Sequence, residues 1–343
     1  MKDLIFNKKI EFKYSILYYI MFSEKLIHII KEKRPLLKDS SIDLYIRNMK
    51  ILSKSLDVPF ENVNFLLNKK NVDEALILKS PATVKTYYAS IVVVLKALEF
   101  NEDIIKEYSD AMDTLSETNQ SFLETQEKNK KQDDNWMEYK ELIKVMNYLR
   151  KQVSALKLLK KPVESLTNKE FMLIQKWVVA SLYLIDPDNN PPIRLGYAPM
   201  KIISHKDWLK SIDDGEKPKE NYLVIVNRNN KKFVFNNYKT QSTYSERIIT
   251  VGKLLNNVLN KWLKINTTDY LLLTIKKVPM NSNGLTKFIQ NIFDYTNKRV
   301  SVSMIRHAYL TDRYMADNVD KKAIAELMLH SQSTQIEYIK KNN

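Results

Sequence analysis

The chain has 343 residues and a formal net charge of +15 at pH 7, with 55 Lys and Arg against 40 Asp and Glu. This length exceeds one ordinary hydrophobic core, so two domains of unequal size are expected. The basic excess favours a polyanionic partner, with nucleic acid first and an anionic membrane surface second. The lack of Cys excludes disulfides, thiolate zinc sites and Cys nucleophiles, and four Gly exclude Gly-rich phosphate loops. With only four His, a metal site of several His is not expected.

The N-terminal segment 1–35 is predicted to be a helical extension. Its apolar run YSILYYIMF is followed at once by Ser23, Glu24 and Lys25, so the run is too short to span a bilayer. No small-residue cleavage site follows, so a secretory signal peptide is not expected either. The run instead begins an amphipathic helix that continues through EKLIHIIKEKR and ends at Pro35.

Segment 36–118 is predicted to be an all-helical unit. In DSSIDLYIRNMKILSKSL, apolar residues recur at helical spacing behind a Ser40/Ser41 cap. In KSPATVKTYYASIVVVLKALEF, Ser80 is the expected N-cap and Pro81 the first helical residue. Each segment therefore has one apolar face that can pack into a core.

Three lysines of the second of these helices are candidates for DNA contact. Lys79, Lys85 and Lys96 lie off its apolar stripe, where their amino groups can meet phosphates. A solvated charged face is the commoner explanation for lysines at such positions, and it stays open.

A linker and a larger second domain follow. Residues 119–135 lose apolar periodicity and become charged and rich in amides, which predicts an interdomain linker. Residues 136–343 form the predicted second domain. Its main helical patterns are TNKEFMLIQKWVVASLYLI, VGKLLNNVLNKWLKI, GLTKFIQNIFDYTNK, SVSMIRHAYLTDRYMAD and KKAIAELMLH. Between them, NYLVIVNR, KKFVFNNY and ERIITV have period-two character and predict a small antiparallel sheet.

Three cationic residues of the second domain are candidates for phosphate chemistry. Arg194 follows a buried helix on a Pro-stiffened turn, and Arg306 lies on a helix whose neighbouring positions look internal. Two buried guanidinium groups aimed at one pocket would match the oxygens of a phosphodiester. A salt bridge is the commoner alternative for each Arg alone, and simple exposure is the commoner alternative for Lys239 in its strand-to-strand connection.

The ordered set Arg194, Lys239, SMIRH, MLHS and Tyr338 resembles the tyrosine recombinase (phage integrase) family. The resemblance covers the second domain, and the preceding helices look like that family's core-binding domain. It implies a mainly α protein, with a helical core-binding (SAM-like) domain and a mixed α+β catalytic domain that contains the small antiparallel sheet.

The resemblance also implies a role for each matching residue. Arg194 and Arg306 match the two active-site arginines, Lys239 the hairpin Lys, His330 the His or Trp of the L-x-H-S motif and Tyr338 the nucleophile. Tyr338 would attack a phosphate held by the arginines, Lys239 would protonate the departing 5′ oxygen, and His330 would donate to a non-bridging oxygen. The product would be a 3′-phosphotyrosine linkage, formed without metal, nucleotide or other cofactor.

Two positions depart from the family pattern. Ser303 stands three residues before Arg306, where the family commonly has His, and Ser cannot act as a base in the same pH range. Ser303 remains a catalytic candidate because its hydroxyl can hydrogen-bond the phosphate. Tyr197 stands where many members have an acidic residue, and we expect it to change the orientation of Arg194. His307, adjacent to Arg306, is expected to contact DNA together with the three lysines.

The sequence therefore predicts a site-specific DNA recombinase or integrase of a virus or other mobile element. Its expected partner is double-stranded DNA, bound by a homotetramer on two sites inside the cell, in cytoplasm, nucleoid or host nucleus, with no membrane or nucleotide involved. Two alternatives stay open. A type IB topoisomerase shares the chemistry but works as a monomer, and Ser303 supports a DNA-binding relative with impaired catalysis. On position alone, the polar end around Tyr338 would be left to fray.

Overall fold

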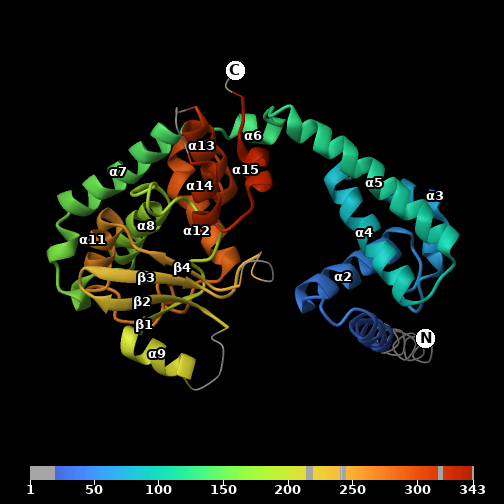
Figure 1. Cartoon of the computed structure of the whole chain (residues 1–343), viewed down its shortest axis with the longest axis horizontal. Helices are drawn as coiled ribbons and strands as arrows, with labels where there is room; N and C mark the ends of the chain where they lie inside the picture. The colour runs from blue at the N-terminus through green and yellow to red at the C-terminus, as the bar shows by residue number, and fades with distance from the viewer. Residues whose placement is uncertain (1–19, 214–218, 240, 242–244, 316–319, 342–343) are drawn as a thin grey trace, which may run out of the picture. The chain divides into compact units, whose positions relative to one another are not determined.

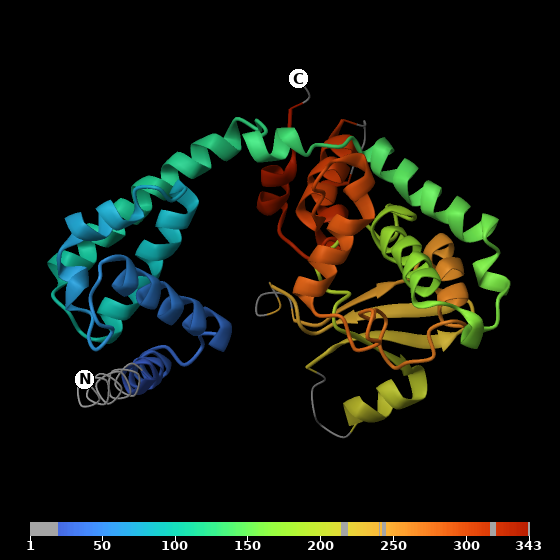
Figure 2. The same ribbon diagram turned by 180° about the vertical axis from the view of Figure 1, so that it is seen from behind.

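The computed structural model describes residues 20–213, 219–239, 241, 245–315 and 320–341. The chain divides into two compact units, Met1–Thr125 and Gln126–Asn343 (Figures 1 and 2). The described part of each unit has its own hydrophobic core. Within the described ranges, no helix combines the length and the apolar character that a membrane crossing requires.

The first unit is built from helices. A helix covers 20–33, and the others are α2 (Asp39–Ser55), η1 (Asn64–Leu67), α3 (Lys69–Leu76), α4 (Pro81–Ala97) and α5 (Glu102–Glu124). Leu26 and Ile30 are fully buried in the core of this unit. The predicted extension 1–35 is therefore part of the first unit from residue 20 onward, and its residues 1–19 lie outside the described ranges.

The caps of two helices test the sequence signals directly. The Ser80 hydroxyl accepts a hydrogen bond from the Thr83 amide at 3.3 Å, and Pro81 is the first residue of α4, as predicted. At α2 the N-cap is Lys38, which makes no side-chain cap. The predicted Ser40/Ser41 cap is therefore wrong, because α2 begins before both serines and contains them in its first turn.

The three candidate lysines belong to α4 and the turn before it. Lys79 and Lys96 are exposed, and Lys85 is half-buried. Lys85 and Lys96 are eleven residues apart, so they lie on one side of the helix about three turns, roughly 16 Å, from each other.

The predicted linker 119–135 is mostly helical, although the boundary between the two units falls inside it. The helix α5 extends to Glu124, and α6 (Lys130–Asp134) begins at a capping box formed by Asn129 and Gln132. In α5 only Ile105 and Tyr108 are buried, both near its beginning, so its second half needs no apolar stripe. The polar sequence therefore reflects an exposed helix, which composition alone does not distinguish from a coil.

The second unit combines helices with one small sheet. Its further elements are α7 (Tyr139–Ala155), η2 (Leu158–Lys160), η3 (Val163–Ser165), α8 (Asn168–Leu184), β1 (Met200–Ser204), α9 (His205–Asp213), β2 (Asn221–Asn227), β3 (Asn230–Phe235), β4 (Arg247–Thr250), α11 (Lys253–Trp262), α12 (Ser282–Phe293), η4 (Asp294–Thr296), α13 (Val302–Tyr314), α14 (Lys321–Leu327) and α15 (Gln332–Tyr338). The helices α13, α14 and α15 lie side by side at one end of this unit in both views (Figures 1 and 2).

The sheet has four strands in the order β1-β2-β3-β4, and it is mixed. The pairs β2/β3 and β3/β4 are antiparallel, as predicted, but β1 runs parallel to β2. The prediction of a purely antiparallel sheet is therefore wrong for one strand, β1, which the sequence analysis missed. MKIIS is short and passes directly into α9, so neither alternation nor a turn signal marks it as a strand.

Both faces of the sheet are covered. Leu223 and Phe233 lie in the main core of the unit, whereas Val224 and Val234 pack with Trp208 of α9 on the other face. Successive residues of a strand point to opposite faces, so burial on both sides explains why apolar residues are consecutive in the YLVIV run of β2 and the FVF run of β3.

Candidate active site

A buried arginine lies at the centre of the candidate site. Val302, Ile305 and Tyr309 of α13 pack into the core, and Arg306 on the same helix is fully buried with them. Its Nη1 donates to the carbonyl oxygens of Pro192 at 3.1 Å and Met328 at 3.5 Å. The helix α13 therefore connects the loop after α8 with the end of α14 through one guanidinium group.

The loop 186–194 carries Arg194 and is tied to α13 at three points. Besides the Arg306 bond to Pro192, the Tyr309 hydroxyl donates to the Pro187 carbonyl at 3.1 Å, and Arg313 forms an ion pair with Asp188. Residues 306, 309 and 313 are spaced three and four apart, so they lie on one face of the helix. This face holds the whole loop along the helix.

Arg194 is half-buried at the end of that loop. Its carbonyl accepts a hydrogen bond from the hydroxyl of Tyr183 in α8 at 3.2 Å. Its guanidinium group is close enough to Arg306 and His330 to lower the pKa of both. The structure therefore brings the two predicted arginines to one place, although they are far apart in the sequence.

A helix cap places His330 in the same cluster. After α14, the His330 amide donates to the Ala325 carbonyl at 3.2 Å and the Leu329 amide to the Glu326 carbonyl at 3.2 Å. Leu329 has φ of 60°, so these bonds form the Schellman arrangement that ends many helices. The motif turns the chain inward, and His330 is only 4% exposed.

Tyr338 ends α15 and is packed against the cluster. Its ring lies 4.6 Å from the Arg306 guanidinium carbon, 4.7 Å from the His307 ring and 5.8 Å from the His330 ring. The residue is 8% exposed. The expectation that this end would fray is therefore wrong, because Tyr338 is held by Arg306 of its own chain through a cation–π contact.

Burial and positive charge determine the protonation of this cluster. Burial lowers the pKa of His330 to about 3, and the guanidinium groups of Arg306 and Arg194 add to the decrease. Burial also lowers the pKa of Arg306, with Tyr338 opposing the change. For His307 burial lowers the pKa to about 4, against the effect of its bond to the Tyr338 main chain. Both histidines are therefore neutral at pH 7.

Stability should fall in mild acid because of these two histidines. Their folded-state pKa values lie below the value of about 6.5 in the unfolded chain, so the unfolded chain binds protons first as the pH falls. The stabilisation is complete at pH values above the unfolded-state pKa and is lost progressively as the pH falls below it. Between pH 7 and pH 5, each histidine should lower the free energy of unfolding by about 2 kcal/mol.

Denaturant titrations of wild type and His330→Gln at the two pH values would measure this effect. The decrease between pH 7 and pH 5 should shrink by about 2 kcal/mol in the variant. The exposed His28 gives the control, because His28→Gln should leave the decrease unchanged. An equal decrease in wild type and His330→Gln would contradict the buried, neutral state of His330.

Part of the hydrogen-bonding capacity of the cluster is not used by the described residues. Among the described residues, Nε and Nη2 of Arg306 and both ring nitrogens of His330 make no hydrogen bond of normal geometry. Buried donors without partners are costly, and a buried cation beside a second cation is more so. An anion between Arg306, Arg194 and His330 would pair with these donors and offset the repulsion.

Three other predicted positions lie differently. Ser303 is exposed on the first turn of α13, and Lys239 is exposed on the connection between β3 and β4. Among the described residues, neither makes a hydrogen bond or ion pair with the buried cluster. Tyr197 is in the core, where its ring packs 5.4 Å from that of Tyr183, the residue that holds the Arg194 carbonyl. Tyr197 thus contacts the residue that holds the Arg194 carbonyl.

His307 faces the protein and not the solvent. Its Nδ1 lies 2.8 Å from the carbonyl oxygen of Tyr338, and its Nε2 lies 3.2 Å from the side-chain nitrogen of Gln132. Both ring nitrogens are therefore engaged within the free chain, and the DNA contact that the sequence suggested for His307 stays a prediction.

The sequence analysis missed the residues that hold the site together. Tyr183 and Tyr309 bind carbonyl groups of the Arg194 loop, and Gln132 contacts His307 from a segment interpreted as linker. Their only sequence signal was an aromatic or polar residue at an internal position, which is typical of ordinary core residues too.

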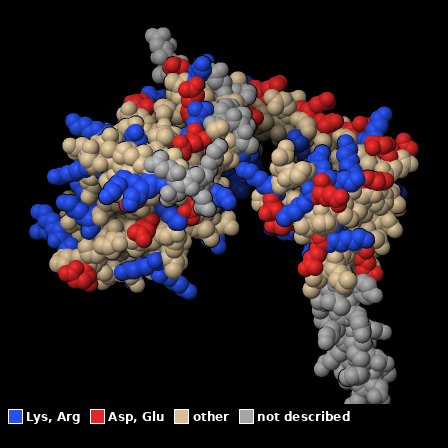
Figure 3. Space-filling model, turned by 60° about the horizontal axis from the view of Figure 1, so that its bottom comes forward, with Lys and Arg blue, Asp and Glu red and all other residues tan. Residues whose placement is uncertain are grey.

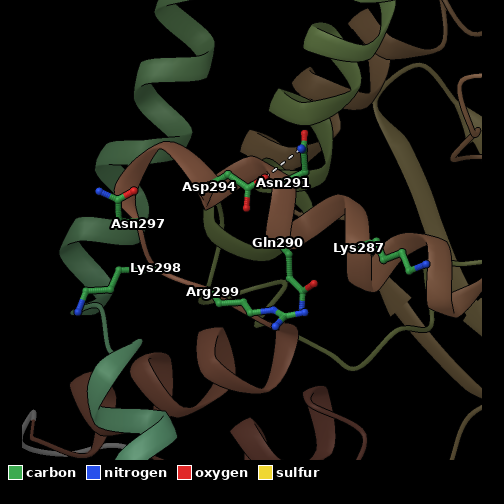
Figure 4. Close-up of a pocket in the computed structure, with 7 residues that line it drawn as sticks. All are labelled: Lys287, Gln290, Asn291, Asp294, Asn297, Lys298 and Arg299. Carbon is green, nitrogen blue, oxygen red and sulfur yellow. Dashed lines mark hydrogen bonds between the residues drawn. The ribbon is translucent and has the colours of Figure 1, made fainter.

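A basic pocket lies at the end of α12, about 370 Å³ in volume (Figure 4). It is lined by Lys287, Gln290, Asn291, Asp294, Asn297, Lys298 and Arg299. The Lys298 amino group donates to the Asp134 carbonyl at 2.8 Å, whereas the Arg299 side chain extends into the pocket (Figure 4). On the face of the second unit in Figure 3, Lys and Arg cover more of the surface than Asp and Glu.

Comparisons with known proteins find structural similarity alone. No family model and no curated protein matches the sequence. The structure is similar to that of XerA recombinase, with 12% sequence identity, a TM-score of 0.36 and coverage of 94% of each chain. It is also similar to the XerH site-specific recombinase bound to its difH substrate, with 12% identity, a TM-score of 0.38 and coverage of 94% of this chain and 92% of that one.

Proposed function

We propose that this protein is a tyrosine-type site-specific DNA recombinase, which cuts and rejoins DNA strands through a 3′-phosphotyrosine intermediate. One observation carries the proposal. A tyrosine lies against a buried arginine and a buried histidine. Among the described residues, Nε and Nη2 of that arginine and the ring nitrogens of that histidine make no hydrogen bond of normal geometry. A second arginine lies close enough to lower the pKa values of both. These are the groups that a phosphodiester under attack by a tyrosine would need.

In the cleavage step, the Tyr338 oxygen bonds to phosphorus, and the bond to the 5′ oxygen breaks. Arg194 and Arg306 pair with the non-bridging oxygens, whose negative charge increases in the transition state. Donors that are already in place and buried stabilise this charge strongly, because little solvent or side-chain reorganisation is required. Attack by the new strand's hydroxyl on the phosphotyrosine reverses the step and frees the enzyme.

The remaining groups can be given roles as donors of hydrogen bonds or protons. His330 is neutral, so it has one N–H to donate to a non-bridging oxygen. Lys239 supplies the proton for the departing 5′ oxygen once bound DNA brings the two together. Among the described residues of the free chain, it makes no hydrogen bond or ion pair with the cluster. Ser303 contributes a hydrogen bond to the phosphate but no base, so the proton of Tyr338 passes to solvent water and not to a residue at that position.

Double-stranded DNA would contact both units. Lys85 and Lys96 are spaced along one side of α4, with Lys79 just before it, and can follow a phosphate backbone. The pocket at the end of α12 offers Lys287 and Arg299 for a further phosphate. Strand exchange between two sites would require a homotetramer, and the setting would be a virus or mobile element within a cell.

Covalent capture tests the proposal. The purified protein is incubated with a library of nicked duplex DNA, which traps the phosphotyrosine because the short cleaved strand diffuses away. Protein-bound DNA is then recovered under denaturing conditions and sequenced. Attachment at 3′ ends, at a recurring sequence, and through Tyr338 by mass spectrometry is expected. Failure to recover any adduct would favour a DNA-binding relative with impaired catalysis, for which Ser303 is the motivating residue.

A type IB topoisomerase is the second candidate, because the same cluster would serve its chemistry. Relaxation of a supercoiled plasmid of any sequence, without recombinant products between two sites, would favour it over the recombinase.

A further inference from the structure

The carbonyl of Tyr338 is held by a chain of two side chains that begins outside the cluster. His307 Nδ1 lies 2.8 Å from this carbonyl oxygen, and His307 Nε2 lies 3.2 Å from Nε2 of Gln132. Gln132 belongs to α6, in the segment that follows α5 and precedes α7. The nucleophile's main chain is thus connected through hydrogen bonds to a segment about two hundred residues earlier.

The direction of every bond in this chain follows from the cap of α6. The main-chain N–H of Asn129 donates to Oε1 of Gln132 at 3.0 Å. The NH₂ group of the Gln132 side chain therefore faces His307. An NH₂ group only donates, so His307 Nε2 must accept, and Nδ1 must carry the hydrogen that reaches the Tyr338 carbonyl. His307 is therefore held as the neutral Nδ1–H tautomer.

The residues after Tyr338 are fixed on the same segment. The Lys340 amino group donates to the Glu127 carbonyl at 3.2 Å, and the Lys341 amide donates to the Gln126 carbonyl at 2.9 Å. The Lys340 amide also donates to Thr311 on α13 at 2.9 Å. Lys340 is 3% exposed, which is unusual for lysine.

We propose that Gln132 and His307 are positioning residues for Tyr338, and that segment 126–132 sets where the nucleophile lies relative to Arg306. The inference rests on the proposed role of Tyr338 as nucleophile. A shift of this segment would move the end of α15 through both the His307 bond and the Lys340 contact. Because the segment continues directly from α5, a change in the first unit on DNA would reach Tyr338 by this route.

Gln132→Glu tests the chain without disturbing the cap. A carboxylate can still accept from the Asn129 amide, as Glu does in capping boxes, but it cannot donate to His307 Nε2. His307 must then carry its hydrogen on Nε2, or become doubly protonated. Above the pKa of the histidine in this variant, Nδ1 would face the Tyr338 carbonyl without a hydrogen, and the bond would be lost.

The pH dependence of the variant is the decisive measurement. The groups that face His307 are Tyr338 on α15, Lys340 after it, Arg306 on α13 and Gln132 on α6. The introduced carboxylate raises the pKa of His307 from its wild-type value of about 4, because it stabilises the imidazolium form. Doubly protonated His307 donates in both directions, so the native geometry returns at low pH and is lost as the pH rises.

We therefore expect covalent adduct formation by Gln132→Glu to be about tenfold slower than wild type at pH 8 and to approach the wild-type rate near pH 6. Its DNA affinity at fixed salt should stay within about twofold, because no phosphate contact changes. The matched control is Lys130→Gln, which makes the same change of one charge unit on exposed α6. It should follow wild type at every pH, and equal rates for Gln132→Glu at every pH would overturn the proposal.

Nitrogen-15 NMR of histidine-labelled protein gives a readout that does not depend on cleavage. The chain has only four His, so the His307 signals can be assigned with single His→Gln variants. Wild type should show His307 neutral at pH 6 with the hydrogen on Nδ1, and Gln132→Glu should show it on Nε2 or on both nitrogens. An Nε2–H tautomer in wild type would contradict the proposed hydrogen bonds from Gln132 through His307 to Tyr338. Loss of adducts in wild type itself would instead refute the proposed function.

Discussion

Replacing Tyr338 by Phe is expected to abolish the covalent protein–DNA adduct while DNA affinity changes by no more than about a factor of three. The hydroxyl oxygen forms the bond to phosphorus, so no residual adduct should remain at this position. Affinity depends on many phosphate contacts, among which one hydroxyl carries little. The ring still lies over the Arg306 guanidinium, so the melting temperature should change by only about 2 °C.

The measurement compares adduct yield on a nicked duplex with equilibrium binding to the same duplex. Tyr295→Phe serves as the control, because Tyr295 is an exposed tyrosine of the same unit, outside the cluster, and should retain full adduct yield. Adduct formation by Tyr338→Phe would show that another residue is the nucleophile, and peptide mapping of the adduct would identify it.

Replacing Arg306 has the second largest expected effect. If its Nε and Nη2 donors, which make no hydrogen bond of normal geometry among the described residues, clamp the phosphate in the transition state, Arg306→Lys should slow cleavage by about a hundredfold or more. Lysine keeps a positive charge but not the planar fork, so a single ammonium nitrogen must serve both the Pro192 carbonyl and the phosphate, without bidentate geometry. The ratio of cleavage rates on a nicked duplex, at saturating protein, gives the effect directly.

Stability must be followed in parallel, because Arg306 also holds the fold. Arg306→Ala would leave the Pro192 and Met328 carbonyls unpaired and a cavity beside Tyr338, at a cost of about 3 kcal/mol. The lysine variant separates this cost from the chemistry. Arg313→Lys is the matched control, because Arg313 ties Asp188 on the same helix face but does not face the cluster. A near-normal rate for Arg306→Lys would reduce Arg306 to a structural role.

Local sequence signals predicted the helices and strands that have clear caps or long apolar runs. Ser80 and Pro81 mark the start of α4, and the long apolar run of α8 predicts a buried helix; both are confirmed. The parallel strand β1 and the helix α9 were missed, because each is short and derives its stability from packing against β2 rather than from its own pattern. Tertiary contacts decide such segments, and a single sequence does not display them.

The candidate site likewise has residues that the sequence predicted and residues that it did not. Resemblance selected Arg194, Arg306, His330 and Tyr338, and the structure brings these four together. Their supports could not be predicted, since Tyr183, Tyr309 and Gln132 act on main-chain atoms or on another side chain, and such contacts leave no motif. His307 illustrates the limit, because its place next to Arg306 gave no sign of its contact with Gln132 of α6. A helix turns successive residues by about 100°, so neighbours in sequence can contact different elements.

The three ties between α13 and the loop 186–194 have a thermodynamic consequence for the whole molecule. They keep the two positively charged guanidinium groups near each other before any phosphate binds. The repulsion between these groups therefore lowers the free energy of unfolding of the free protein. An anion that enters between Arg194 and Arg306 removes this repulsion, and the energy gained contributes to its binding. Folding and DNA binding are therefore linked, and phosphate-bearing ligands should stabilise the second unit by an amount that grows with their concentration.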